Sequence, residues 1–154
     1  MMNQFAKLQS SQHQTPIMLD TCMIASAYEN RPEALELRKK LAHRKDVRIM
    51  VPGTQVREVA EVVGVGGEQV LELVESFSKM GQIDYIIEDD DRIASEADKL
   101  KAKYPRFCHS PDDIYLAYCK ELGVLLVTYY NNLRKVARME GIMTCTPGNF
   151  RPYQ

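Results

Sequence analysis

The strongest constraint on the fold is the apolar run at residues 124–128, where no polar side chain occurs before Thr128. A short, wholly apolar run is typical of a β-strand covered on both faces, because a strand with one wet face alternates apolar and polar residues. Strands of that kind occur in parallel sheets packed between layers of helices. The run therefore predicts an α/β fold.

The rest of the chain repeats this pattern of short strands separated by helices. Further strands are predicted at residues 17–20, 48–52, 83–87 and 142–146. The connecting segments have helical spacing of apolar residues, with Gly or Pro at several ends. Such alternation calls for helices on both faces of a sheet. We expect a three-layer α/β/α sandwich with a central, mostly parallel sheet of about five strands.

The length of 154 residues suits one domain with one sizeable core. Residues 1–15 are rich in Gln and Ser without apolar periodicity, so we expect a mobile N-terminal segment. The domain is expected at residues 16–147, followed by a C-terminal tail at 148–154.

Composition narrows the classes of function. The formal charge is -1 and the pI is near 6.3, so the chain as a whole is not an electrostatic nucleic-acid binder. No apolar run approaches the length of a membrane span and the N-terminus lacks a signal-peptide core, so a cytoplasmic location is expected and no membrane partner. The four cysteines are too far apart for a Cys-x-x-Cys pair and are expected to be reduced thiols.

Three basic stretches stand out locally, at residues 38–48, 99–106 and 134–138. They could contact phosphates despite the near-neutral total, or they could be solvated helix faces. The candidate nucleic-acid contacts are Arg38, Lys39, Arg44, Lys45, Arg106 and Arg134.

Three acidic residues lie where such a fold gathers side chains. Asp20 ends the first predicted strand, and Glu58 lies in the helix after the second. Asp113 lies in the first turn of the helix that precedes residues 124–128. The carboxyl ends of parallel strands meet at one edge, so these groups can converge. Carboxylates held together need a cation, and an oxygen-only site suits Mg²⁺ or Mn²⁺.

The segments around these acids resemble the PIN domain family, the nucleases that include the toxins of VapBC-type toxin–antitoxin pairs. The resemblance spans residues 16–147. It rests on the strand ending in Asp20 and Thr21, on the segment 51–59 around Glu58, and on the Asp113 helix followed by a strand ending in Thr128.

The chain departs from the family pattern after Thr128. Many members place a further Asp two residues on, where this chain has Tyr130, and Asn131 and Asn132 follow. These oxygens are poorer ligands for a hard dication than a carboxylate. Asp112 could compensate, although its side chain points about 100° around the helix from that of Asp113.

The resemblance implies metal-dependent hydrolysis of RNA, expected to be single-stranded, with a toxin-like role and an antitoxin-like partner. Asp20 and Asp113 would hold the Mg²⁺ or Mn²⁺, and Glu58 would complete the ligand set or orient water. Thr21 and Thr128 would form supporting hydrogen bonds or contact the phosphate. The alternative is a weak or inactive PIN module that binds RNA or a protein.

Other features have plainer explanations. The glycines of residues 64–67 follow a helix rather than a strand, which favours a helix break over a phosphate-binding loop. The acids at 88–91 begin a helix, where capping is favoured over a metal cluster. A haloacid-dehalogenase-type site would need an Asp where Cys22 stands. The apolar helix at 68–80 could form a homodimer interface.

Overall fold

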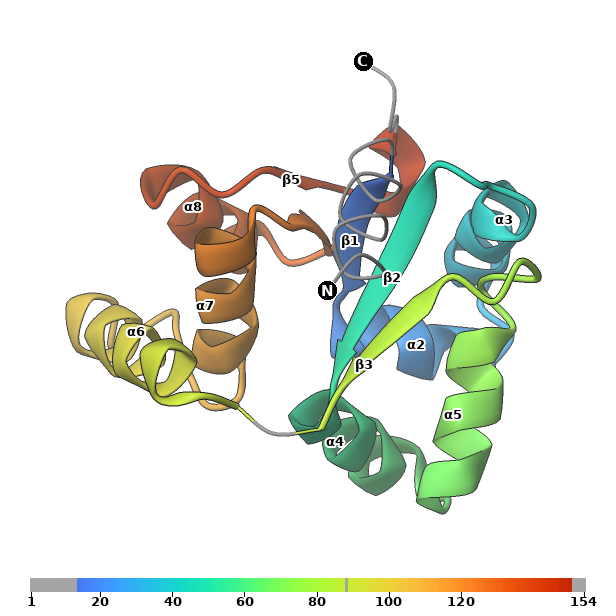
Figure 1. The fold of residues 1–154 in the computed structure, drawn as a ribbon, viewed down its shortest axis with the longest axis horizontal. Coiled ribbons are helices and arrows are strands. Elements are labelled where there is room, and N and C mark those ends of the chain that lie inside the picture. The colour runs from blue at the N-terminus through green and yellow to red at the C-terminus, as the bar shows by residue number, and fades with distance from the viewer. Residues whose placement is uncertain (1–13, 88, 151–154) are drawn as a thin grey trace, which may run out of the picture.

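The computed structural model describes residues 14–87 and 89–150 and contains a five-stranded sheet of parallel strands (Figure 1). The spatial order is β3-β2-β1-β4-β5. Every neighbouring pair runs parallel. The strands are β1 (Thr15–Leu19), β2 (Val47–Pro52), β3 (Ile83–Ile86), β4 (Leu125–Val127) and β5 (Thr144–Cys145).

Helices connect the strands along the chain, as the alternating pattern predicts. Positive backbone φ at Gly64 and Gly123 ends two of them, a conformation that glycine adopts without steric cost. Asp90 Oδ1 accepts from the backbone N–H of Ile93 over 2.9 Å and caps another. The helices are α2 (Thr21–Tyr28), α3 (Pro32–Leu41), α4 (Gly53–Val63), α5 (Gly67–Glu75), α6 (Asp91–Lys103), α7 (Asp112–Leu122) and α8 (Asn131–Met139).

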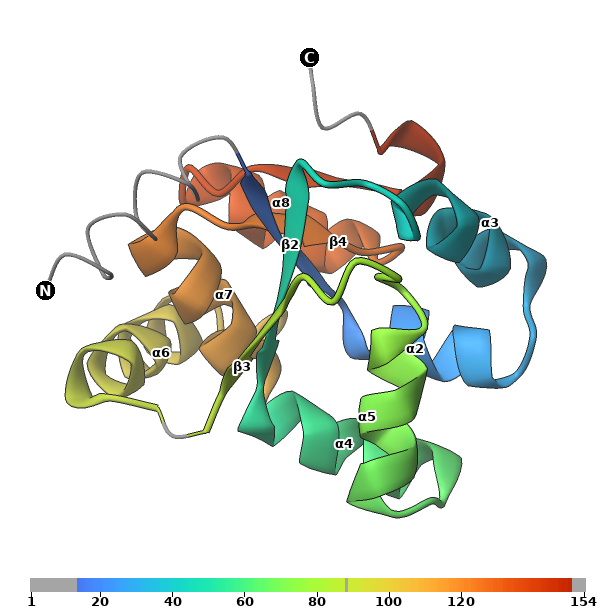
Figure 2. The same ribbon diagram turned by 45° about the vertical axis from the view of Figure 1, so that its right-hand side comes forward.

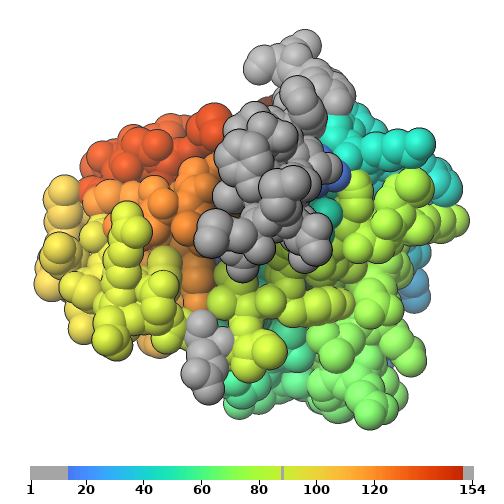
Figure 3. All heavy atoms as spheres, viewed as in Figure 1, coloured from blue at the N-terminus to red at the C-terminus, as the bar shows by residue number. Residues whose placement is uncertain are grey.

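Helices cover both faces of the sheet, which confirms the three-layer α/β/α sandwich. Ile17 and Leu19 of β1 belong to the core shared with α2 to α5, whereas Met18 belongs to the core shared with α6 to α8. This alternation is what a pleated strand buried on both faces requires. In Figure 3, α6 (yellow) lies at the left of the molecule and α5 (green) at the lower right.

The carboxyl ends of β1 and β2 meet at one edge of the sheet, where α2 and α4 begin (Figures 1 and 2). β1 lies between β2 and β4. The chain adds β2 and β3 on one side of β1 and later adds β4 and β5 on the other side, so the strand order reverses at β1. A crevice outside the strand ends at such a reversal point is the usual ligand site of open α/β sheets.

Two predicted features differ from the structure. The first residues of the expected tail are structured: the 3-10 turn η1 (Pro147–Asn149) leads to Phe150, which is 2% exposed and belongs to the core. The apolar face expected to serve a dimer is covered within the chain, because Val70, Val74 and Phe77 are all fully buried. Residues 1–13 and 151–154 of the predicted terminal segments lie outside the described residues.

Across residues 14–87 and 89–150, no helix combines the length and apolar character that a membrane crossing requires.

Candidate functional site

Asp20 lies at the carboxyl end of β1, immediately before α2, and is 3% exposed. Its backbone N–H donates to the carbonyl of Val127 on β4, so the residue is fixed by the sheet itself (2.9 Å). Gln55 Nε2 of α4 donates to the carbonyl of Leu19 over 2.6 Å and ties α4 to the same strand end. The position of Asp20 is therefore set by three elements.

Two side chains hold the carboxylate of Asp20 in place. Thr128 Oγ1 donates to Asp20 Oδ2 over 2.6 Å, and Thr128 is fully buried. Cys22 Sγ lies 3.6 Å from the same oxygen. Both residues follow a strand end, β4 and β1 respectively. Thr128 thus holds one oxygen of Asp20 by a hydrogen bond, and Cys22 adds a thiol beside the same oxygen.

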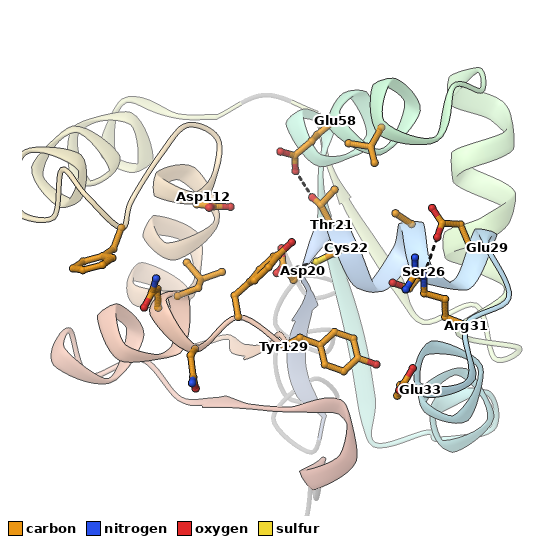
Figure 4. A pocket seen from close by; sticks show the side chains of 17 residues that line it. Asp20, Thr21, Cys22, Ser26, Glu29, Arg31, Glu33, Glu58, Asp112 and Tyr129 are labelled. Atoms are coloured by element: carbon orange, nitrogen blue, oxygen red, sulfur yellow. Dashed lines mark hydrogen bonds and ion pairs between the residues drawn. The ribbon is translucent and has the colours of Figure 1, made fainter.

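Glu58 projects from α4 toward the same strand end (Figure 4). Its Oε1 accepts a hydrogen bond from Thr21 Oγ1 and another from Tyr115 Oη, the latter over 3.0 Å. Tyr115 is 1% exposed and belongs to α7. Glu58 is thereby linked to α2 and α7 at once.

The two acids at the start of α7 point in different directions. Asp112 faces Asp20 and Glu58 across a common pocket (Figure 4). Asp113 does not line this pocket. It is 5% exposed, and its Oδ1 has no hydrogen-bond partner among the described residues. The charged side chains that act on it are Lys101 and Asp98 of α6. The structure brings Asp112, not Asp113, to Asp20.

The pocket is an open cavity of about 930 Å³ at the carboxyl edge of the sheet. Side chains from α2, α4, α7 and the start of α8 surround it. Its acidic lining residues are Asp20, Glu29, Glu33, Glu58 and Asp112.

Burial and mutual repulsion act on the acids of this pocket. Burial raises the pKa of Asp20, and the hydrogen bond from Thr128 offsets part of that effect. Burial, followed by repulsion from Asp20 and Glu58, raises the pKa of Asp112 to about 7. A bound dication would relieve both effects.

The carboxylates share a pocket without yet forming a closed metal cluster. In the part of the chain that the structure describes, no three or more His, Cys, Asp or Glu side chains are close enough together to hold an ion. Glu58 is engaged by Thr21 and Tyr115. The oxygen-only donors and the raised pKa of Asp20 and Asp112 nevertheless fit Mg²⁺ or Mn²⁺.

Tyr130 lies close to the acids, at the position where the resemblance described above would place a further Asp. A hydrogen bond with the Cys22 thiol is the largest cause that raises the pKa of Tyr130, to about 12, and Asp20 and Asp112 add to the effect. The phenol is therefore neutral and supplies no fourth negative charge. Asn131 and Asn132 also line the pocket, and Asn131 Oδ1 accepts from Arg134 over 2.6 Å.

The candidate phosphate contacts divide between the two edges of the sheet. Arg38 and Lys39 lie in the last turn of α3, and Arg44 and Lys45 lie just before β2, at the edge opposite Asp20. Arg44 is also paired with Asp46 over 2.6 Å. Arg106 precedes a pocket residue, Phe107, and Arg134 Nη1 donates to the carbonyl of Thr128 over 3.0 Å. None of these six basic residues is among the described residues that line the pocket.

Sequence reasoning missed several residues of the pocket. Arg31 lines it beside Glu29, to which it is paired over 2.9 Å. Phe107 and Tyr129 line it as well, although they come from different connecting loops. Only Tyr129 carried a sequence signal, because it directly follows Thr128.

The sequence of the chain matches a known family. The sequence profile of the PIN domain matches residues 17–139, which is most of the chain. The chain therefore belongs to the PIN domain family. A search of curated proteins found no match.

Solved structures share the fold at low sequence identity. VapBC2 from Rickettsia felis, bound to a DNA fragment from its promoter, is 16% identical and matches with a TM-score of 0.63 over 86% of this chain and 98% of that chain. VapBC-1 from nontypeable Haemophilus influenzae is 17% identical, with a TM-score of 0.61 over 88% and 100%. FitAcB from Neisseria gonorrhoeae is 16% identical, with a TM-score of 0.58 over 87% and 99%.

Proposed function

We propose that the chain is a metal-dependent ribonuclease that hydrolyses phosphodiester bonds of RNA at the pocket around Asp20. The observation that carries this proposal is the convergence of Asp20, Glu58 and Asp112 on one cavity at the carboxyl edge of the sheet. Membership of the PIN domain family supports it.

Asp20 and Asp112 would hold the Mg²⁺ or Mn²⁺, and Glu58 would complete the ligand set or orient the attacking water. This assignment replaces Asp113 by Asp112, because Asp113 faces α6 instead of the pocket. When bound, such a cation lowers the pKa of a coordinated water and stabilises negative charge on a phosphate.

The chain's own residues would prepare this chemistry. Thr128 orients the Asp20 carboxylate by its 2.6 Å hydrogen bond, and Thr21 and Tyr115 do the same for Glu58. Arg134 is held against the Thr128 carbonyl and against Asn131, which lines the pocket, and would contact a phosphate from there. Arg106 would add a second contact from the loop before α7.

Incubation with single-stranded RNA tests this proposal. Cleavage is expected with Mg²⁺ or Mn²⁺, and EDTA or the substitution Asp20→Asn is expected to abolish it, because the cation loses its principal ligand. Equal RNA breakdown by the wild type, Asp20→Asn and the EDTA-treated protein would contradict the proposal.

A second function has one specific observation in its favour. Neutral Tyr130 stands where many family members have a carboxylate, which reduces the charge available for a second cation. On this reading the chain is a weak or inactive PIN module that binds RNA or a protein. RNA binding without cleavage in the same assay would identify it.

We also propose a toxin role with an antitoxin partner, which the similarity to two VapBC structures supports. Co-expression with the product of an adjacent small gene, followed by co-purification, tests this part.

We also propose a cytoplasmic location, where the four cysteines, which are free in the structure, would stay reduced.

A further inference from the structure

Three aromatic rings line the acidic pocket and remain open to solvent. Phe107 is 46% exposed, Tyr129 is 37% exposed and Tyr130 is 58% exposed. They come from the loop before α7 and from the segment that joins β4 to α8. Exposed rings gathered at a concave site mark a surface for a ligand with apolar faces.

The residues that line the pocket attract the phosphate backbone little, because Arg106 and Arg134 are not among them. Of the described residues that line it, five are acidic and Arg31 alone is basic. Arg31 is itself paired with Glu29 over 2.9 Å. One divalent cation offsets only part of this negative charge. A polyanion therefore needs an attraction here that does not depend on its phosphates.

We propose that Phe107 and Tyr130, assisted by Tyr129, stack on the bases of single-stranded RNA and hold the strand over the carboxylates. This inference rests on the proposed function and names its means of recognition. A ring can stack only on a base whose face is free, so a duplex, whose bases cover one another, is excluded from the pocket.

The position of Tyr130 suits this role. It lines the pocket together with Asp20, and 58% of its surface is open to solvent. The ring therefore lies beside the carboxylate and has room for a base. Asn131 and Asn132, both exposed, adjoin it with amide groups able to bond base edges.

Binding of a short uridine-rich RNA that carries one 2-aminopurine tests the inference. Stacking quenches the fluorescence of 2-aminopurine, and the chain has no tryptophan to interfere. Ca²⁺ replaces Mg²⁺ so that binding is measured without turnover. Quenching is expected with the single strand, and little binding with the same RNA annealed to its complement.

Matched variants separate stacking from other effects. Tyr130→Leu and Phe107→Leu are each expected to weaken binding about 5- to 150-fold, the usual range for loss of one base stack. Tyr130→Phe keeps the ring and is expected to bind like the wild type. Tyr85→Leu is the control, because Tyr85 is 42% exposed on β3 and does not line the pocket.

Undiminished binding and quenching in both Tyr130→Leu and Phe107→Leu would overturn the inference and leave these rings to a protein partner. If RNA is nevertheless cut with Mn²⁺, the ribonuclease proposal stands without the stacking. Ring-dependent quenching without any cleavage has the opposite meaning: the stacking stands and the ribonuclease proposal fails.

Discussion

Asp112→Asn is expected to lower metal-dependent RNA cleavage at least about 100-fold, whereas Asp113→Asn is expected to change it less than about threefold. Asp112 faces Asp20 across the pocket, and loss of a carboxylate that holds the cation removes several kcal/mol of charge stabilisation in the transition state. Asp113 faces α6 and does not contact the pocket. Initial rates of cleavage of one single-stranded RNA with Mn²⁺ measure both effects.

The neighbouring substitutions are matched controls for each other, since they make the same chemical change on one helix turn. Asp113→Asn is expected to fold as well as the wild type or better, because burial raises the pKa of Asp113 and Asn has nearly the same shape without a charge to bury. If Asp113→Asn lost the activity and Asp112→Asn kept it, our assignment of the third carboxylate would be wrong.

The second large effect is on stability in the absence of metal. Burial, more than any other cause, raises the folded-state pKa of Asp112 from its ordinary value of 3.8 to about 7. An acid with a raised folded pKa contributes stability at low pH, and that contribution is lost as the pH rises through the folded value. With EDTA, the free energy of unfolding is therefore expected to fall between about pH 4 and pH 7 on account of this group.

Asp112→Asn removes this loss, so at pH 8 with EDTA it is expected to be more stable than the wild type by on the order of 2 kcal/mol. Urea denaturation at pH 5 and pH 8 measures the difference. Mn²⁺ at pH 8 is expected to stabilise the wild type more than the variant, because a ligand that binds only the folded state stabilises it. A variant no more stable than the wild type at pH 8 would show that Asp112 is not under this repulsion.

The sheet and the position of Asp20 could be predicted because they depend on local sequence. Short apolar runs such as residues 124–127 are typical of strands buried on both faces of a parallel sheet, and Asp20 directly follows one. Thr128 followed from the same rule, since it ends the adjacent strand β4 and meets Asp20 through a hydrogen bond.

The choice between Asp112 and Asp113 could not be made in this way. Both lie in the first turn of α7, and one residue rotates a side chain by about 100°. Which of them faces the pocket depends on how α7 packs against the sheet and α6. Every residue from Tyr115 to Cys119 is buried, on one side of the helix or another. When a helix has apolar residues on all sides, the sequence does not indicate which side faces the pocket.

The electrostatic surface was also beyond local sequence reasoning. Runs of Lys and Arg at residues 38–48 are adjacent in sequence, but the turn before β2 carries several of them to the edge opposite Asp20. Conversely, Phe107 and Arg31 reach the pocket from loops with no distinctive pattern. Only the three-dimensional arrangement shows that the pocket is acidic and aromatic.

The central claim is that Asp20 and Asp112, with Glu58 beside them, hold one divalent cation. Anomalous X-ray scattering from crystals grown with Mn²⁺ tests it directly. The expected result is a strong Mn²⁺ peak in the pocket within bonding distance of the carboxylates of Asp20 and Asp112. A pocket without such a peak, or a peak beside Asp113 in its place, would contradict the account.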